Sequence, residues 1–220
     1  FVHLTLLPFL KASGEMKTKP TQQSVGKLRE IGIQPDVLVC RCEHPMTEGM
    51  RKKISMFCNV RENNVIQEID VPTTIYEVPL DLQKHGLDVA VVDRLGLPSV
   101  ANVDMSDWQD LVTRWANPQH TIEIAVVGKY IELHDAYKSI YESLAHAGTA
   151  NNTKVIFRKI AAESLCDGDV NTALQGVSGV LIPGGFGERG LEGKINAIRW
   201  ARENDIPTFG ICFGMQAITI

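Results

Sequence analysis

A single cysteine near the end of the chain, Cys212, stands between Gly210 and Gly214. Residues 208–211 before it are typical of a short strand, so the Gly-x-Cys-x-Gly spacing predicts a tight turn with the thiol at its apex and a helix directly behind it. Small residues are needed on both sides because the strand and helix backbones pass close together there. The turn leaves the amide N–H of Phe213 free to face a developing oxyanion. The pattern therefore predicts a thiol nucleophile for acyl transfer.

A buried structural cysteine is the alternative, because free cysteines are among the most buried residues. A core cysteine, however, needs neither flanking glycines nor the second glycine turn, Pro-Gly-Gly-Phe-Gly at residues 183–187. That turn can bring another backbone N–H to the same site. Because Gly185 follows a buried strand and a further glycine, we expect a backbone conformation or close approach there that no Cβ tolerates.

A second chemical signal is the segment Lys-Thr-Lys-Pro-Thr-Gln at residues 17–22. Its cationic and hydroxyl donors, on a loop stiffened by proline, are suited to binding a triphosphate. The glycine spacing of a P-loop is absent. A solvated surface turn is the alternative explanation for this segment.

The composition is that of an ordinary globular protein: 220 residues, 24.3 kDa, 44% hydrophobic and 22% charged. A net charge of −4 gives no indication of nucleic acid as a partner. No apolar run reaches the ~18 residues that predict a membrane span. The five cysteines are an odd number without framework spacing, which predicts a reduced, cytoplasmic environment, and the isolated Cys40-x-Cys42 pair does not predict a metal site.

Both ends of the chain look cut. It opens without Met inside an apolar segment, and it stops at Ile220, within the helix expected after Cys212. We therefore expect an internal part of a longer protein.

Strand and helix patterns alternate along the first part of the chain. Expected strands are residues 1–10, 36–41 and 65–69, expected helices are residues 24–31, 47–57 and 79–86, and a polar, lysine-rich loop is expected over residues 11–22. This alternation predicts a parallel α/β sheet.

The pattern weakens between residues 96 and 119, where one amphipathic helix is expected over residues 107–115 between Pro98 and Pro118. A second unit follows, with expected strands at residues 122–127, 155–160, 179–182 and 208–211, and expected helices from Asp135 to a stop at Gly148 and over residues 191–203. The predicted fold is α/β: two doubly wound parallel-sheet domains, both truncated, at residues 1–96 and 121–220, joined by a linker at 97–120.

Seven segments together resemble the CTP synthase family, in register over the whole chain: residues 14–24, 35–41, 54–59, 127–133, 135–139, 183–193 and 210–216. The cysteine turn alone is typical of all class I glutamine amidotransferases, and the Lys-Thr-Lys-Pro-Thr-Gln segment selects the family. The resemblance implies a Rossmann-like amidoligase domain joined to a glutamine amidotransferase domain.

The family resemblance implies a ligase of pyrimidine biosynthesis. L-glutamine is hydrolysed at the cysteine, and the ammonia attacks UTP that ATP has phosphorylated at O4, which gives CTP. It also implies GTP as allosteric activator, CTP as product inhibitor, and a homotetramer that can form filaments. The family's Mg²⁺ ligands and ATP phosphate loop would lie before Phe1, and its triad His and Glu after Ile220. We therefore expect no metal site in this part, which should be inactive alone.

The resemblance also assigns roles to residues of this sequence. The UTP or CTP phosphates would contact Lys17, Thr18, Lys19, Pro20, Thr21, Gln22 and Lys53. The ATP adenine would lie against Ile69, Asp70 and Val71. Cys212 would be the nucleophile, Gly185 would bind glutamine and supply an oxyanion N–H, and the glutamine pocket would be lined by Phe213, Gly214, Met215 and Gln216. GTP would act near Arg189 and Glu192.

If residues 17–22 bind a triphosphate, Lys17 and Lys19 should converge on one cleft with Lys53, which is distant in the sequence. A surface turn gives no reason for that convergence.

Two other functions stay open at this point: another class I amidotransferase with a different synthetase partner, and a non-catalytic assembly paralogue.

Overall fold

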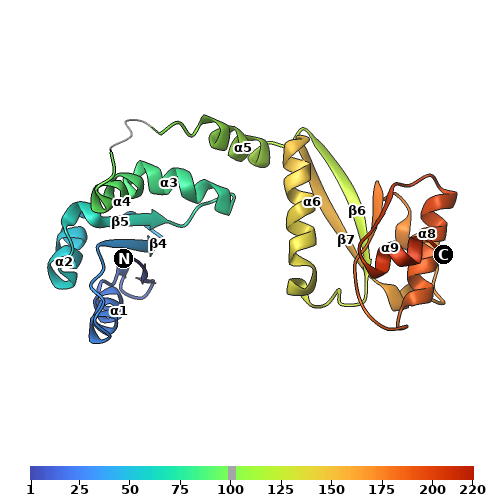
Figure 1. Cartoon of the computed structure of the whole chain (residues 1–220), viewed down its shortest axis with the longest axis horizontal. Helices are drawn as coiled ribbons and strands as arrows, with labels where there is room; N and C mark the ends of the chain where they lie inside the picture. Colours follow the sequence, from blue (N-terminus) through green and yellow to red (C-terminus); the bar gives the residue numbers. More distant parts are fainter. Residues whose placement is uncertain (99–102) are drawn as a thin grey trace. The chain divides into compact units, whose positions relative to one another are not determined.

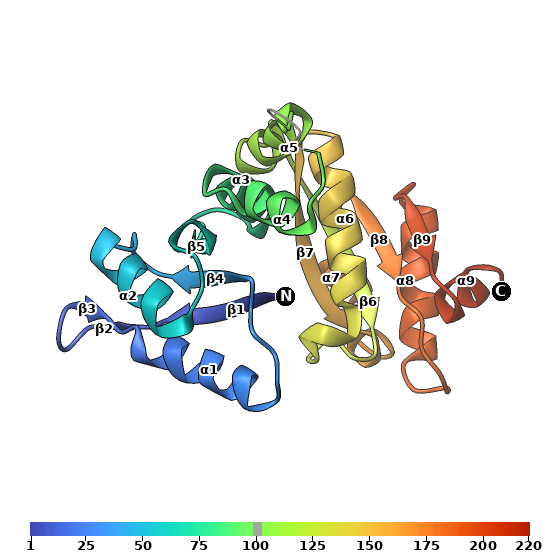
Figure 2. The ribbon, with the colours of Figure 1, turned by 60° about the vertical axis from the view of Figure 1, so that its left-hand side comes forward.

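The computed structural model describes residues 1–98 and 103–220. They form two compact units, Phe1–Ala116 and Asn117–Ile220, and the division falls inside the stretch predicted as a linker. Each unit has its own parallel sheet with helices on both faces, which confirms the predicted α/β class (Figures 1 and 2).

The sheet of the first unit has the strand order β1-β4-β5, all parallel: β1 (Val2–Leu7), β4 (Val37–Cys42) and β5 (Val65–Ile69). A short antiparallel hairpin follows β1, formed by β2 (Phe9–Leu10) and β3 (Glu15–Met16). The helices are α1 (Lys19–Glu30), α2 (Glu48–Cys58), α3 (Val78–Lys84), α4 (Leu87–Leu95) and α5 (Ser106–Ala116), with 3₁₀ turns η1 (Glu62–Asn64) and η2 (Ile75–Glu77).

The central strand β4 is apolar because both of its faces are buried. Leu38 and Cys40 pack on one face with residues of α1 and α2, and Val37 and Val39 pack on the other with α4. Figure 1 shows α3 and α4 on the opposite side of this sheet from α1. Because helices cover both faces of the sheet, the ends of the strands are the places where a site can form.

Helix α1 begins at Lys19, whereas the sequence predicted a loop through residue 22 and a helix from residue 24. Thr18 is the N-cap and Pro20 lies in the first turn. Proline is tolerated there because a first-turn N–H has no acceptor within the helix. The Lys-Thr-Lys-Pro-Thr-Gln segment is therefore a helix N-terminus rather than a loop.

Helix α4 is absent from the sequence prediction, which had one helix over residues 79–86. The structure ends α3 at Lys84 and begins α4 at Leu87. Gly86 between them has φ +82°, a left-handed conformation that lets the chain turn and start a second helix.

The sheet of the second unit has the order β7-β6-β8-β9, again all parallel: β6 (His120–Gly128), β7 (Thr153–Ala161), β8 (Gly179–Ile182) and β9 (Thr208–Gly210). The helices are α6 (Lys138–Ala150), α7 (Val170–Leu174), α8 (Leu191–Glu203) and α9 (Phe213–Ile218), with 3₁₀ turns η3 (His134–Tyr137) and η4 (Ala162–Leu165). The bounds of β8 and α8 are those that the sequence predicted.

Alternate residues of β6 and β8 face opposite sides of this sheet. Val126 and Leu181 pack with Tyr141 of α6, and Val127 and Ile182 pack on the other side with residues of α7 and α8. Figure 1 shows α6 and α8 on opposite sides of the strands.

The expected stop of α6 at Gly148 is wrong, because the helix continues to Ala150. A Cβ on Gly148 would lie 2.5 Å from the carbonyl oxygen of Thr153. This glycine therefore permits close packing against the start of β7 and is not a terminator.

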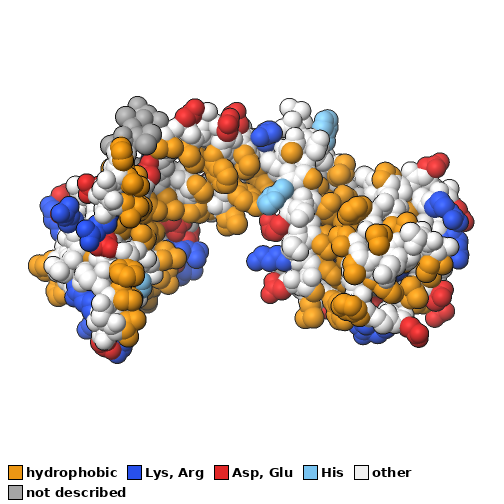
Figure 3. Space-filling model, in the orientation of Figure 1, with side chains coloured by type: hydrophobic (Ala, Val, Ile, Leu, Met, Phe, Trp, Pro, Cys, Tyr) orange, Lys and Arg blue, Asp and Glu red, His pale blue; other side chains and the backbone are white. Residues whose placement is uncertain are grey.

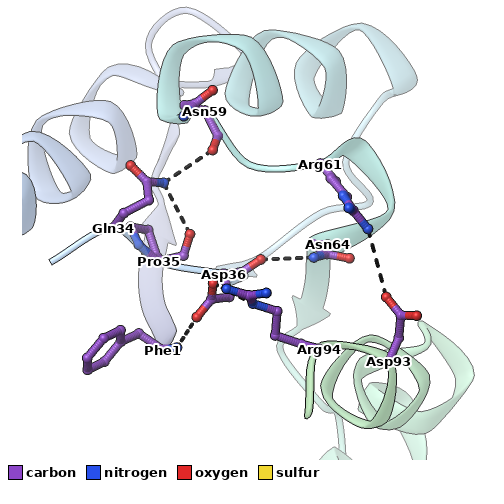
Figure 4. Close-up of polar contacts among 9 residues, drawn as sticks. All are labelled: Phe1, Gln34, Pro35, Asp36, Asn59, Arg61, Asn64, Asp93 and Arg94. Atoms are coloured by element: carbon purple, nitrogen blue, oxygen red, sulfur yellow. Dashed lines mark hydrogen bonds and ion pairs between the residues drawn. The ribbon is translucent and has the colours of Figure 1, made fainter. Parts of the chain in front are cut away.

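A polar network joins the amino ends of β4 and β5 in the first unit (Figure 4). Gln34 Nε2 donates to the carbonyl oxygen of Asn59 (3.2 Å), and Asn64 Nδ2 donates to that of Asp36 (2.9 Å). Arg94 Nε pairs with Asp36 Oδ1 at 2.7 Å. These contacts tie the segments before β4 and β5 to each other and to α4.

On the face drawn in Figure 3, cationic and anionic side chains are interspersed over both units. Within residues 1–98 and 103–220, no helix has the length and apolar character needed to cross a membrane.

Candidate functional sites

Cys212 lies between the end of β9 and the start of α9, in a strained turn. Its φ of +53° and ψ of −110° are rarely adopted by a residue with a side chain. Such a conformation costs ~1–3 kcal/mol and is concentrated at functional sites. Cys212 is exposed, so the alternative of a buried core cysteine is wrong.

The two glycines that flank Cys212 are sterically required, as the spacing predicts. A Cβ on Gly214 would lie 2.0 Å from the carbonyl oxygen of Ile182, and one on Gly210 would lie 2.5 Å from the carbonyl carbon of Gly214. Both contacts are to backbone atoms, which cannot rotate away. The turn is held by the amide of Ile211, which donates to the same oxygen of Ile182 (3.0 Å).

The expectation that Gly185 cannot tolerate a Cβ is wrong in this structure. The nearest heavy atom to such a Cβ would be Lys194 Nζ, at 3.7 Å, and the φ of Gly185 is not in the left-handed region. Gly184 lies closer to the nucleophile, because a Cβ added to Gly184 would be 3.5 Å from Cys212 Cβ. The glycine turn thus lies against Cys212, and the steric demand falls on Gly210 and Gly214.

A third segment, directly after β6, holds the glycine turn from the other side. Lys129 Nζ donates to the carbonyl oxygen of Phe186 (3.0 Å). The amides of Lys129 and Tyr130 both donate to Tyr137 Oη, at 3.1 and 3.2 Å. A Cβ on Gly128 would lie 2.7 Å from the Tyr137 ring, so a side chain there would displace that ring and the hydroxyl that binds the two amides. Sequence reasoning gave these residues no role, although they lie in two segments of the family resemblance.

The other predicted glutaminase residues surround the turn. Gly214 is buried, Phe213 is half-buried, and Met215 and Gln216 are exposed. The amide of Gln216 donates to the carbonyl oxygen of Cys212 (3.1 Å), which is the first helical bond of α9.

Of the two residues near which GTP is expected to act, Arg189 forms an ion pair and Glu192 is exposed. Arg189 Nε lies 2.9 Å from Glu163 Oε1.

Lys194 is a further residue at this site that sequence reasoning missed. Its side chain is 2% exposed, and its ammonium lies 4.8 Å from the centroid of the Phe213 ring. Lys194, Ala197 and Ala201 are buried at i, i+3 and i+7 of α8. A lysine on the apolar face of an amphipathic helix is the signal that could have identified it.

In the first unit, a cavity of about 600 Å³ lies between the β2–β3 hairpin, the start of α1 and the start of α2. Its lining includes Lys17, Thr18, Lys19 and Lys53. The predicted convergence of the three lysines is therefore confirmed. A solvated surface turn does not account for it.

One carboxylate shares this cavity with the lysines. Glu15 forms an ion pair with Lys17, and the pKa of Glu15 is lowered by that hydrogen bond, by the Lys17 charge and by the charge of Lys53. Three cations and one anion leave a net positive cavity, which favours an anionic ligand. The neighbouring Lys52 instead pairs with Glu48 at 2.6 Å, outside the cavity lining.

The side chains of three predicted phosphate contacts, Pro20, Thr21 and Gln22, are not in the cavity lining. Thr21 is buried, and its Oγ1 donates to the carbonyl oxygen of Leu6 (3.2 Å). Gln22 Nε2 donates to Thr18 Oγ1 (3.2 Å). Thr21 and Gln22 thus anchor the first turn of α1 against β1 and Thr18.

A second cavity in the first unit, of about 670 Å³, lies at the carboxyl end of β5. Ile69, Asp70 and Val71 line it together with Asp81 and with both polar and apolar residues of α3 and α5. Asp70 pairs with Arg41 Nε at 2.6 Å, and Asp81 Oδ2 accepts a hydrogen bond from the amide of Ile69 (3.3 Å). The three residues assigned to the ATP adenine therefore lie together at one cavity.

No group of three or more His, Cys, Asp or Glu side chains in residues 1–98 and 103–220 is arranged to hold a metal ion.

Two family models match the chain. Residues 1–97 match the CTP synthase N-terminus, and residues 132–220 match glutamine amidotransferase class I.

Matches to curated relatives cover all 220 residues of this chain. CTP synthases of Ruminiclostridium cellulolyticum and Clostridium perfringens are each 53% identical to the chain, and that of Oleidesulfovibrio alaskensis is 51% identical. The matched region is 100% of this chain and 41%, 41% and 40% of those relatives, respectively. The chain thus spans less than half the length of the curated relatives that it matches.

Among solved structures, the glutaminase domain of Trypanosoma brucei CTPS with bound acivicin is 38% identical to this chain. The match covers 44% of this chain and 38% of that one, with a TM-score of 0.40.

Proposed function

Because this chain belongs to the CTP synthase family, we propose that the protein containing it converts UTP to CTP with ATP and ammonia from L-glutamine. The observation that supports this most directly is the pair of sites in one chain. A strained, exposed cysteine lies in the second unit, and three lysines converge on one cavity in the first. Another class I amidotransferase is not favoured, because residues 1–97 match the CTP synthase N-terminus.

In the proposed glutaminase step, the Cys212 thiolate attacks the side-chain amide carbon of glutamine. The C–N bond breaks as the nitrogen takes up the proton that the thiol gave up, and ammonia leaves. The acyl group stays on sulfur as a thioester, which water then hydrolyses to glutamate and free thiol. The negative oxygen of each tetrahedral intermediate needs donors at ~3 Å. The amide of Phe213 follows the nucleophile directly, and Gly185 lies in the turn next to Gly184 and Cys212. We assign these two amides to the oxyanion, and the wall of the glutamine pocket to Gly214, Met215 and Gln216.

In the proposed amidoligase step, the UTP phosphates occupy the three-lysine cavity. Lys17, Lys19 and Lys53 supply ammonium donors, and the first turn of α1 supplies backbone N–H groups, which favour phosphate at a helix N-terminus. Pro20, Thr21 and Gln22 then act by shaping that turn. CTP carries the same phosphates, so the same cavity accounts for product inhibition.

We place the ATP adenine in the cavity beside Ile69, Asp70 and Val71, because its lining combines apolar side chains with polar groups, the mixture that binds a small ligand and fixes its orientation. Mg²⁺ would be held by residues outside those described here and would neutralise the phosphate charge. GTP activation near Arg189 and Glu192, a homotetramer and a cytoplasmic location are proposed on family grounds. Five free cysteines agree with a reducing compartment.

Replacing Lys53 by Met in the full-length protein is expected to weaken apparent UTP affinity roughly 10- to 150-fold. The change removes one charge-assisted contact, worth ~1.5–3 kcal/mol. UTP titration of ammonia-dependent CTP formation measures the effect, and glutaminase activity should be retained.

Lys52→Met is the matched control, because Lys52 is the next residue of α2 and pairs with Glu48 instead. Its UTP dependence should match that of the wild type. If Lys53→Met and Lys52→Met have the same UTP dependence as the wild type, the cavity does not bind the UTP phosphates and the proposed substrate is wrong.

A further inference from the structure

The ammonium of Lys194, a residue that is 2% exposed, lies near both segments that are assigned to the oxyanion. On one side it is 4.8 Å from the centroid of the Phe213 ring, which is within cation–π range. On the other side it is 3.7 Å from the point where a Cβ of Gly185 would lie. Lys194 is thus in contact distance of both the glycine turn and the residue that follows the nucleophile.

Close packing of α8 fixes the position of this side chain. A Cβ on the preceding residue, Gly193, would lie 1.7 Å from the carbonyl oxygen of Ala162. The first turn of α8 therefore lies directly against η4. Asn196 Nδ2 donates to the carbonyl oxygen of Leu165 (3.0 Å) and holds the next turn of α8 to η4 as well. The lysine is consequently aimed at the glycine turn by a rigid support.

The charge of Lys194 is not balanced by a partner. Among residues 1–98 and 103–220, its ammonium forms no hydrogen bond and no ion pair, and it keeps some contact with solvent although the residue as a whole is only 2% exposed. Burial lowers the pKa of Lys194, the charge of Lys129 lowers it further, and Glu163 opposes the shift. A methionine would fill similar volume without this cost, so packing alone does not explain a lysine here.

We propose that Lys194 is a positioning residue of the glutaminase site, whose ammonium holds the Gly185 turn and Phe213 at the spacing in which both amides reach one oxyanion. The inference rests on the proposed glutaminase function of Cys212. The ammonium attracts the face of the Phe213 ring and thereby fixes the first residue of α9. A positive charge behind the two donors also favours negative charge on the oxygen that they bind.

The test compares Lys194→Met with the wild type in the full-length protein. Misplacing an oxyanion donor by ~1 Å costs on the order of 100-fold, so we expect the glutaminase kcat to fall roughly 10- to 100-fold. The KM for glutamine should change less than about threefold, because the substrate is bound by other groups. Ammonia-dependent CTP formation should be unchanged.

Two further measurements separate positioning from a structural role. The rate of Cys212 alkylation by iodoacetamide, followed by peptide mass spectrometry, should equal that of the wild type, because alkylation needs no oxyanion. The thermal midpoint should be equal or higher, because a charge that burial disfavours and that has no ion-pair partner has been removed. Arg202→Met, an exposed change on the same helix, is the control and should leave all of these values unchanged.

A glutaminase kcat for Lys194→Met within twofold of the wild type would overturn the inference. So would a fall in kcat accompanied by a lower thermal midpoint or slower alkylation, because either would show a structural role. Failure of the proposed function is distinguishable, since it would appear as glutaminase activity that survives in Cys212→Ala.

Discussion

Replacing Cys212 by Ala is expected to abolish glutamine-dependent CTP formation by the full-length protein and to leave ammonia-dependent formation close to wild type. The thioester route needs the sulfur, and loss of a covalent nucleophile costs on the order of 10⁶-fold in acyl-transfer enzymes. Supplied ammonia needs no thiol, and the three-lysine cavity lies in the other unit. Steady-state assays with glutamine or ammonium chloride as nitrogen source measure both rates.

Cys166→Ala provides the matched control, because Cys166 is a half-buried thiol of the same unit. Both of its activities should be retained. Loss of both activities in Cys212→Ala would contradict separate sites joined by ammonia transfer. Retained glutamine-dependent synthesis would contradict the nucleophile itself.

The Cys212 turn could be predicted from sequence because its spacing is a steric requirement. A strand that turns directly into a helix brings Gly210 and Gly214 into backbone contact, and only glycine fits at both positions. The convergence of Lys17 and Lys53 could be predicted as well, but only through the family resemblance. Parallel strands place both segments at one edge of the sheet, and nothing local in the sequence specifies that pairing.

Other features depend on tertiary packing that local patterns do not show. Pro20 is equally compatible with a loop and with the first turn of a helix, so the start of α1 was misplaced. Gly148 looks like a helix stop, yet it is required by the close approach of Thr153. Lys194 looks like a surface residue because a lysine is seldom buried, and only its spacing from Ala197 and Ala201 indicates otherwise.

The structure makes opposite predictions for alanine at two glycines beside the nucleophile. Gly214→Ala should destabilise the second unit by about 3 kcal/mol, because the new Cβ would lie 2.0 Å from the backbone oxygen of Ile182. For a unit of this size, Asn117–Ile220, that lowers the thermal midpoint by roughly 12–24 °C. Gly185→Ala should stay within about 1 kcal/mol of the wild type, because its Cβ would meet Lys194 Nζ at an ordinary 3.7 Å.

Calorimetry of the two full-length variants and the wild type measures the thermal midpoint at which the second unit unfolds, and the two variants should differ in it. Circular dichroism below the transition shows whether Gly214→Ala retains its helices. A Gly214→Ala midpoint equal to that of the wild type would mean that β8 and α9 move apart at little cost, and that the close approach is not what requires glycine. A large loss in Gly185→Ala instead would restore the steric demand predicted for Gly185 from its sequence alone.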